Sequence, residues 1–293
     1  MSVRGEGRNK GTNAAAFYRS KVGAWPITAL LDGTVSRERP GNFVGNADPD
    51  AVEEAFCAIG VSPGQLTITF TTLAIELPDQ VVLIDAGFGE NGPPTAGRQV
   101  AALEAAGHEA SEVGTVLLTH FHGDHISGLV TAQDEPVYPN ARVLVPRAEW
   151  AFWMESDLPE SAQRNGKLCR RVFGALEGRI GFFDWDQAVL PGITARAAPG
   201  HTPGHTMFEI ESEGERLLHV ADITNNPLIF ARRPTWQAMF DLDVDHAVET
   251  RQSVLNSVAA SSTRVMFYHA PFPGIGYMVK SGEGFEFMPE IWR

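Results

Sequence analysis

Four side chains that can bind a metal ion stand within six residues of one another: His120, His122, Asp124 and His125. They come directly after a short apolar run, 116–118, which is typical of a buried strand. Imidazole and carboxylate groups are good ligands for divalent transition metals such as zinc. A single buried histidine is more often structural, but four donors exceed what one ion usually takes from so short a segment. The spacing therefore indicates two metal ions, each with further ligands from elsewhere in the chain.

The composition excludes several classes of protein. With 293 residues and 43% hydrophobic content, the chain is long enough for one large core. Its net charge of −13 disfavours a nucleic-acid or anionic-lipid surface. Cys57 and Cys169 form no disulfide framework, which favours a reducing compartment. Because the sequence also lacks an apolar signal core and a long apolar stretch, we expect a soluble cytoplasmic protein without membrane or nucleic-acid partners.

The elements expected around the cluster share one property. Strands are predicted at 81–84, 116–119, 194–198, 217–221 and 264–268, and each is followed at once or within a few residues by Asp or His. Ligands gathered at strand ends on one sheet edge are how α/β enzymes build their sites. Further strands are expected at 66–77 and 142–145, and helices at 49–60, 94–106, 147–154 and 245–260. Asp32-Gly33 is interpreted as a turn.

The order of strands and helices occurs twice, with a seam near residue 187. We therefore expect a flexible N-terminal arm at 1–16 and a single domain of two similar halves at 17–293. Residues 155–180 are charged and fit a surface helix or a lid.

The pattern His120-x-His122-x-Asp124-His125, followed by His201, Asp222 and His269, resembles that of the metallo-β-lactamase superfamily. The resemblance implies an α/β fold, a four-layer αββα sandwich, with two divalent metal ions at one edge. It assigns His120, His122 and His201 to the first metal, and Asp124, His125 and His269 to the second. Asp222 would bridge both. Zinc is the expected metal, with manganese, cobalt or iron as possible substitutes.

Other segments are similar to methyl parathion hydrolase and the quorum-quenching lactonases. They are Phe17-Tyr18-Arg19, residues 27–34, the segment Gly200–Thr206 and the segment His269–Gly276. This similarity implies hydrolysis of lactones, aryl esters or phosphotriesters by a homodimer. One position departs from the archetypal acyl-homoserine lactonases, which have a tyrosine three residues after the bridging aspartate. Asn225 stands there in this chain.

The expected chemistry is attack by a metal-bridging hydroxide on a carbonyl or phosphoryl centre. Asp124 and Asp222 are the expected catalytic carboxylates, because they would orient the hydroxide and fix the metal–metal distance. Asp85 is the candidate that holds the other nitrogen of a ligating imidazole. His205 is a second candidate for such support, although a purely structural role is the other interpretation. His108, His219 and His246 have no ligand spacing.

Aromatic residues near the predicted strand ends suggest an apolar pocket for a hydrophobic ester or lactone. The candidate pocket residues are Phe88, Trp153, Asn225 and Phe272. Two alternatives stay open. A glyoxalase II-type thioesterase would need a basic patch, for which 167–171 is the candidate. A catalytically silent metal-binding protein would require the loss of a ligand or of the open pocket.

Overall fold

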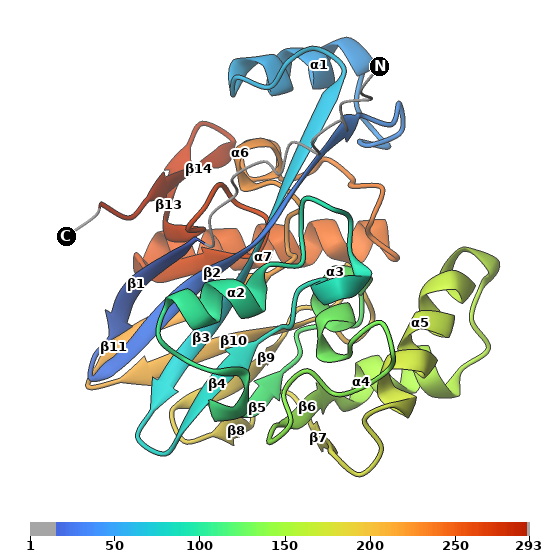
Figure 1. Cartoon of the computed structure of the whole chain (residues 1–293). Helices are drawn as coiled ribbons and strands as arrows, with labels where there is room; N and C mark the ends of the chain where they lie inside the picture. The colour runs from blue at the N-terminus through green and yellow to red at the C-terminus, as the bar shows by residue number, and fades with distance from the viewer. Residues whose placement is uncertain (1–15, 292–293) are drawn as a thin grey trace, which may run out of the picture.

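Two seven-stranded sheets lie face to face at the centre of the molecule (Figure 1). The computed structural model describes residues 16–291, so the predicted arm lies outside the described residues except for Ala16. The first sheet contains β1 (Phe17–Val22), β2 (Trp25–Glu38), β3 (Gln65–Leu77), β4 (Gln80–Ile84), β5 (Val113–Leu117), β6 (Arg142–Pro146) and β7 (Ile180–Phe183). Its strands are antiparallel from β1 to β4 and parallel from β4 to β7.

The second sheet follows in the chain after Phe183. It contains β8 (Ala188–Leu190), β9 (Ile193–Ala197), β10 (Thr206–Ser212), β11 (Glu215–Ala221), β12 (Arg264–Phe267), β13 (Ile275–Ser281) and β14 (Gly284–Pro289). Only β11 and β12 pair in parallel in this sheet. Each sheet therefore has a parallel pair at its centre, and the ends of those strands point to the same edge.

The helices are α1 (Pro49–Ala58), α2 (Gln99–Ala105), α3 (Gly123–Ile126), α4 (Arg147–Trp150), α5 (Gln163–Gly174), α6 (Pro227–Phe230) and α7 (Val244–Ser261). Of these, α2 and α5 lie on the outer face of the first sheet and α7 on that of the second (Figure 1), whereas α1 packs against β3 and α6. Together with the sheets, they form the αββα sandwich that the resemblance implies. Within residues 16–291, no helix has both the length and the apolar character needed to cross a bilayer.

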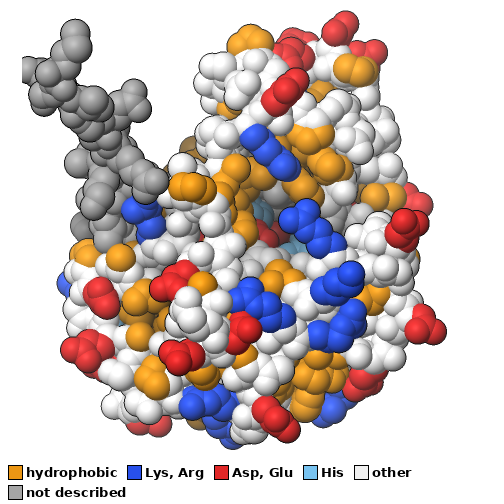
Figure 2. Space-filling model, turned by 45° about the vertical axis from the view of Figure 1, so that its right-hand side comes forward, with side chains coloured by type: hydrophobic (Ala, Val, Ile, Leu, Met, Phe, Trp, Pro, Cys, Tyr) orange, Lys and Arg blue, Asp and Glu red, His pale blue; other side chains and the backbone are white. Residues whose placement is uncertain are grey.

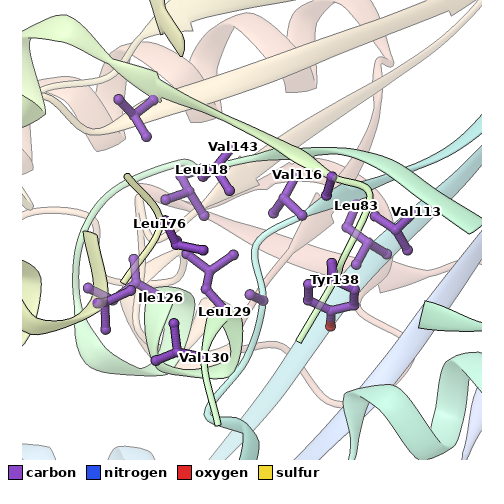
Figure 3. Packing of buried hydrophobic residues seen from close by; sticks show 14 of the residues in the cluster. Leu83, Val113, Val116, Leu118, Ile126, Leu129, Val130, Tyr138, Val143 and Leu176 are labelled. Carbon is purple, nitrogen blue, oxygen red and sulfur yellow. The ribbon is translucent and has the colours of Figure 1, made fainter. Parts of the chain in front are cut away.

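Three apolar layers lie on the faces of the sheets, and a fourth apolar cluster packs α1 against β3 and α6. Leu73, Ile84 and Leu117 of the first sheet pack between the sheets against Phe208 and Met266 of the second. A second layer lies on the outer face of the first sheet, where Leu83, Val116 and Val143 meet Ile126, Leu129 and Val130 (Figure 3). The third lies between the second sheet and α7. Burial of apolar area at about 25 cal/mol per Å² is the main stabilising term for such layers.

Two sequence-based expectations about the N-terminal half are wrong. Asp32-Gly33 is not a turn, because both residues lie inside β2, where the pairing with β3 shifts by one residue between Leu31 and Gly33. The helix predicted to begin at 94 begins only at Gln99. The buried Asp32 carboxylate explains both, since it accepts hydrogen bonds from the backbone N–H groups of Phe88 (3.1 Å), Gly97 (3.1 Å) and Gln99 (3.0 Å). A residue distant in sequence thus caps α2.

Residues 155–180 contain α5, which is a packed helix. Cys169, Val172 and Phe173 on one of its faces are buried in the outer layer of the first sheet. Arg171 on the exposed face pairs with Asp134 at 2.6 Å. The segment is therefore part of the helical layer, as a surface helix would be.

Replacing Asp32 by alanine tests its capping role. Three backbone N–H groups lose their acceptor, so we expect Asp32→Ala to lower the free energy of unfolding by about 3 kcal/mol. Urea denaturation measures the change. Asp157→Ala is the control, because Asp157 is exposed and its loss should change stability by less than about 0.5 kcal/mol. Equal, small effects of both substitutions would contradict the capping role.

Candidate metal centre and substrate cavity

Candidate metal ligands from both halves of the chain meet at one edge of the sandwich. The parallel pairs β4–β5 and β11–β12 end there. The segment with His120, His122, Asp124 and His125 follows β5, and His201 follows β9. Asp222 comes directly after β11, and His269 comes two residues after β12. The fold therefore brings together all seven predicted metal ligands.

Three of these side chains form a first group of donors: His120, His122 and His201. His122 Nδ1 lies 3.1 Å from His120 Nε2 and 2.9 Å from His201 Nε2. All three nitrogens therefore converge on one point, as the ligands of a single ion would.

The second group contains Asp124, His125, Asp222 and His269. His269 Nε2 lies 2.9 Å from Asp222 Oδ2 and 3.4 Å from Asp124 Oδ2. His125 Nε2 lies 3.5 Å from both Asp124 Oδ2 and Asp222 Oδ1. Asp222 Oδ2 is also only 3.5 Å from His201 Nε2 of the first group. The Asp222 carboxylate thus lies between the two groups, where a bridging ligand would be.

The donors fit divalent cations. His125 Nε2 and Asp222 Oδ1 are buried and make no hydrogen bond with another described residue. Burial lowers the pKa of His120 well below its usual value and that of His122 to about 3, so both imidazoles offer neutral lone pairs. Burial acts in the same direction on His125, but nearby carboxylates, Asp222 first, outweigh it and raise its pKa. The field that favours a proton there would also favour a cation.

Asp85 and Thr119 orient two of the imidazoles. Asp85 Oδ2 lies 2.8 Å from His125 Nδ1 and accepts a hydrogen bond from Thr119 Oγ1 at 2.8 Å. Because the Thr119 hydroxyl donates to Asp85, it accepts from His120 Nδ1 at 3.0 Å. Both imidazoles then carry their protons on Nδ1 and turn Nε2 toward the centre. Asp85 makes the contact that its predicted role requires, whereas the sequence analysis missed Thr119.

His201 and His269 are oriented by groups that the sequence analysis also missed. His201 Nδ1 lies 2.9 Å from Asp241 Oδ1, and Asp241 Oδ2 accepts from the buried Arg251 at 3.0 Å. His269 Nδ1 donates to the carbonyl oxygen of Thr69 at 2.8 Å. Asp241 lies 40 residues from its histidine in an irregular connection, with no local motif that could have indicated its role.

A buried carboxylate, Glu149 of α4, ties together two loops that carry ligands. Its Oε1 accepts from the backbone N–H of Phe121 at 3.0 Å, and its Oε2 accepts from Thr202 Oγ1 and Gly204 N–H at 2.8 Å each. Trp153 Nε1 donates to Oε1 at 2.6 Å. A side chain at Gly204 would collide with the backbone of Glu149. Glu149 therefore fixes the loop of His120 and His122 relative to the loop of His201.

His205 acts on the backbone beside a ligand. The backbone N–H of Asp222 donates to His205 Nε2 at 3.0 Å, so the ring proton lies on Nδ1, which donates to the Ala198 carbonyl at 2.9 Å. Burial lowers the pKa of His205 to about 3, which keeps this tautomer neutral. Ala221, the residue before Asp222, has a left-handed φ of 45°. His205 thus helps to hold a strained backbone that aims Asp222 at the centre.

A cavity of about 430 Å³ opens over the two groups of donors, and His side chains are visible in its hollow (Figure 2). Its walls are largely apolar, formed by Val35, Ile68, Phe70, Phe88, Pro93 and Phe240. Arg37, Gly123 and Asn225 complete the lining beside the donor side chains.

Two of the four predicted pocket residues, Phe88 and Asn225, line this cavity. The other two, Trp153 and Phe272, are not among its lining residues. Trp153 is buried in the outer apolar layer, where its indole is held by Glu149. Phe272 packs against the apolar layer between the sheets. Phe272 was predicted from its proximity to a strand end, and Trp153 from the family resemblance. Neither criterion shows on which side of a loop an aromatic ring packs.

Comparisons with solved structures give the same fold. AidC, described as a dizinc quorum-quenching lactonase in complex with the product N-hexnoyl-L-homoserine, superposes with a TM-score of 0.91 at 26% identity, covering 96% of this chain and 99% of that one. AbOPH, described as a hydrolase in the beta lactamase superfamily, superposes with a TM-score of 0.88 at 26% identity over 95% and 99% of the two chains.

Sequence comparisons point to the same group of proteins. An N-acyl homoserine lactonase of Bacillus sp is 25% identical over 174 residues, which are 52% of this chain and 63% of that protein. The lactamase-like protein ptaB of Pestalotiopsis fici is 25% identical over 241 residues, or 81% and 62%. The matched part thus covers less than two thirds of either relative. Residues 69–269 match the family described as the metallo-beta-lactamase superfamily. With more than half of its length matched, this chain belongs to the metallo-β-lactamase superfamily.

Proposed function

We propose that this protein is a two-metal hydrolase that opens lactones. The observation that carries the proposal is the position of Asp222, whose Oδ2 lies within 3.5 Å of both His201 Nε2 and His269 Nε2. A carboxylate shared between two groups of donors is what a binuclear site needs. The similarity to AidC and to the Bacillus lactonase supports the choice of a lactone as substrate.

The roles of the residues follow from their positions. His120, His122 and His201 would hold one divalent ion, Asp124, His125 and His269 the other, and Asp222 both. When bound, the ions would supply Lewis acidity and a solvent nucleophile at neutral pH. Zinc suits these donors, as do manganese, cobalt and iron. Asp124 and Asp222 would orient the nucleophile. Asn225 lines the cavity, and its Oδ1 has no partner among residues 16–291, so this oxygen is free to accept a hydrogen bond from the substrate.

The cavity favours a substrate with an apolar chain next to the scissile bond, because Val35, Ile68 and Phe70 form its walls. Aryl esters and phosphotriesters present similar electrophilic centres and belong to the proposal as further substrates. Homodimerisation and a cytoplasmic location stay predictions from the sequence. For the thioesterase alternative, the candidate basic segment 167–171 lies on α5, where Cys169 is buried and Arg171 is paired with Asp134. Nothing at this segment favours that alternative.

Asp222→Asn tests the shared carboxylate. An amide offers a neutral oxygen in place of a charged bridge, so we expect kcat/KM for N-hexanoyl-homoserine lactone to fall by at least about 100-fold. The circular dichroism spectrum should stay unchanged. Elemental analysis of the same sample reports how many metal ions it retains. Near-wild-type turnover of a fully metal-loaded variant would refute the two-metal proposal.

Metal removal tests the same site without mutation. Dialysis against a chelator should abolish hydrolysis of the lactone, of p-nitrophenyl esters and of a phosphotriester, and added Zn²⁺ or Mn²⁺ should restore it. Relative rates within this panel rank the substrate classes. Activity that survives complete removal of the metal, as verified by elemental analysis, would exclude the proposed chemistry.

Asp241→Asn tests the support of His201. The amide cannot accept from both His201 and Arg251, which each contact one carboxylate oxygen. We expect metal affinity or kcat to fall by about 10- to 100-fold, measured by competition with a chromogenic chelator. The control is Asp79→Asn, because Asp79 lies in an exposed turn between β3 and β4. Equal affinity of the two variants would show that Asp241 does not position the ligand.

A further inference from the structure

One charged residue that is not a candidate metal ligand, Arg37, forms part of the cavity wall. It lies on β2 and is exposed. Among residues 16–291, no hydrogen bond or ion pair engages its guanidinium, whereas Arg39, two residues further on, pairs with Glu53. A cation left without a partner at the wall of a binding cavity is available for a group on the substrate.

The pairing of β2 with β3 fixes how far Arg37 lies from the metal centre. Phe70 marks the inner end, since its ring centroid lies 5.4 Å from that of His269. Phe70 pairs with Gly33, Ile68 with Val35, and Leu66 with Arg37. At about 3.4 Å per residue, the backbone of Arg37 lies about 14 Å beyond the Phe70 pair. The pair Val35–Ile68 lies halfway between Phe70 and Arg37. Along the cavity wall, the candidate metal ligands are therefore followed by apolar side chains and then by the cation of Arg37.

The charge around the opening differs from that of the chain as a whole. The protein has a net charge of −13, yet Lys and Arg side chains surround much of the hollow in which His is visible (Figure 2). Inside the cavity, the only acids among its described lining residues are Asp124 and Asp222, both candidate metal ligands. Divalent cations would offset their charge. The opening would therefore attract anions and raise their rate of association.

We propose that the preferred substrates carry a carboxylate at the end of the acyl chain far from the scissile bond, and that Arg37 binds it. This inference rests on the proposed function, because the metal centre must hold the scissile group for the chain to reach Arg37. The planar guanidinium can donate two parallel hydrogen bonds to a carboxylate. When a substrate with a neutral acyl chain binds, the exposed Arg37 stays hydrated, so its charge is not desolvated. Arg37 therefore favours substrates that end in a carboxylate without excluding neutral ones.

A matched pair of esters tests the proposal: mono-p-nitrophenyl suberate, which ends in a carboxylate, and p-nitrophenyl octanoate, which has the same chain length and no charge. In Arg37→Gln we expect kcat/KM for the suberate ester to fall about tenfold, mainly through KM, while the octanoate ester stays within about twofold. The preference of the wild type for the suberate ester should also decrease with added salt. Equal losses for both esters would overturn the role of Arg37.

The control is Arg142→Gln. Arg142 is exposed and begins β6, at the opposite end of the strands from the metal centre. This variant should keep the full preference for the suberate ester. If Arg142→Gln reduced that preference as much as Arg37→Gln, the preference would be explained by general electrostatic attraction and not by a specific contact with Arg37. The proposal would then be wrong.

Binding separates this inference from the proposed function. Calorimetric titration of the zinc-loaded protein with suberate and with octanoate needs no turnover. We expect the wild type to bind suberate about tenfold more tightly than octanoate. The Arg37→Gln variant should bind the two acids with equal affinity. An equal affinity of the wild type for the two acids would refute the role of Arg37. Tighter binding of suberate without hydrolysis of any ester or lactone would refute the proposed function and support the role of Arg37.

Discussion

The central constraint on this structure is electrostatic. Five imidazoles and two carboxylates share one largely buried space, and their close approach is unfavourable unless positive charge compensates it. His122 Nδ1 lies 3.1 Å from His120 Nε2 and 2.9 Å from His201 Nε2, and because it carries at most one proton, it can donate to only one of these two nitrogens and leaves lone pairs facing each other at the other contact. Two carboxylates without water around them are also unfavourable. Positive charge at the centre would reduce both unfavourable interactions, because it attracts the nitrogen lone pairs and offsets the negative charge of the two carboxylates. The arrangement is therefore explained by cations and would be poorly stable as a purely structural cluster.

Buried polar groups around the centre keep the donors in place. Asp85, Asp241 and Glu149 each use both carboxylate oxygens to bind backbone groups or side chains of separate segments. His205 holds the backbone at Asp222. In a low-dielectric interior such hydrogen bonds are strong and an unpaired partner is costly. The supporting network therefore fixes the positions of the candidate ligands before any ion binds, which would reduce the reorganisation needed in the proposed reaction.

The cavity would add selectivity to the proposed metal centre. Its apolar wall is built by the edges of β2 and β3 with Phe88 and Phe240, and it separates the donors from Arg37. A strand pair provides a rigid scale of about 3.4 Å per residue along which a substrate chain can lie. In the proposed function, one end of the cavity would serve bond cleavage and the other would bind an anion, with a fixed distance between them.

The sequence by itself predicted the candidate ligands and the strands that carry them. The motif at 120–125 and the resemblance to the metallo-β-lactamase superfamily together selected the seven residues that the structure brings together, whereas the rule of Asp or His after each predicted strand also selects Asp85. Apolar strand patterns and local spacing are properties of short segments, so they can be found without coordinates. Only the tertiary structure decided that Asp32-Gly33 lies within β2, that Trp153 and Phe272 pack in apolar layers and do not line the cavity, and that Arg37 lines it. It also revealed Thr119, Glu149 and Asp241, because a buried carboxylate or hydroxyl finds its partners through the packing of distant segments, for which no local pattern exists.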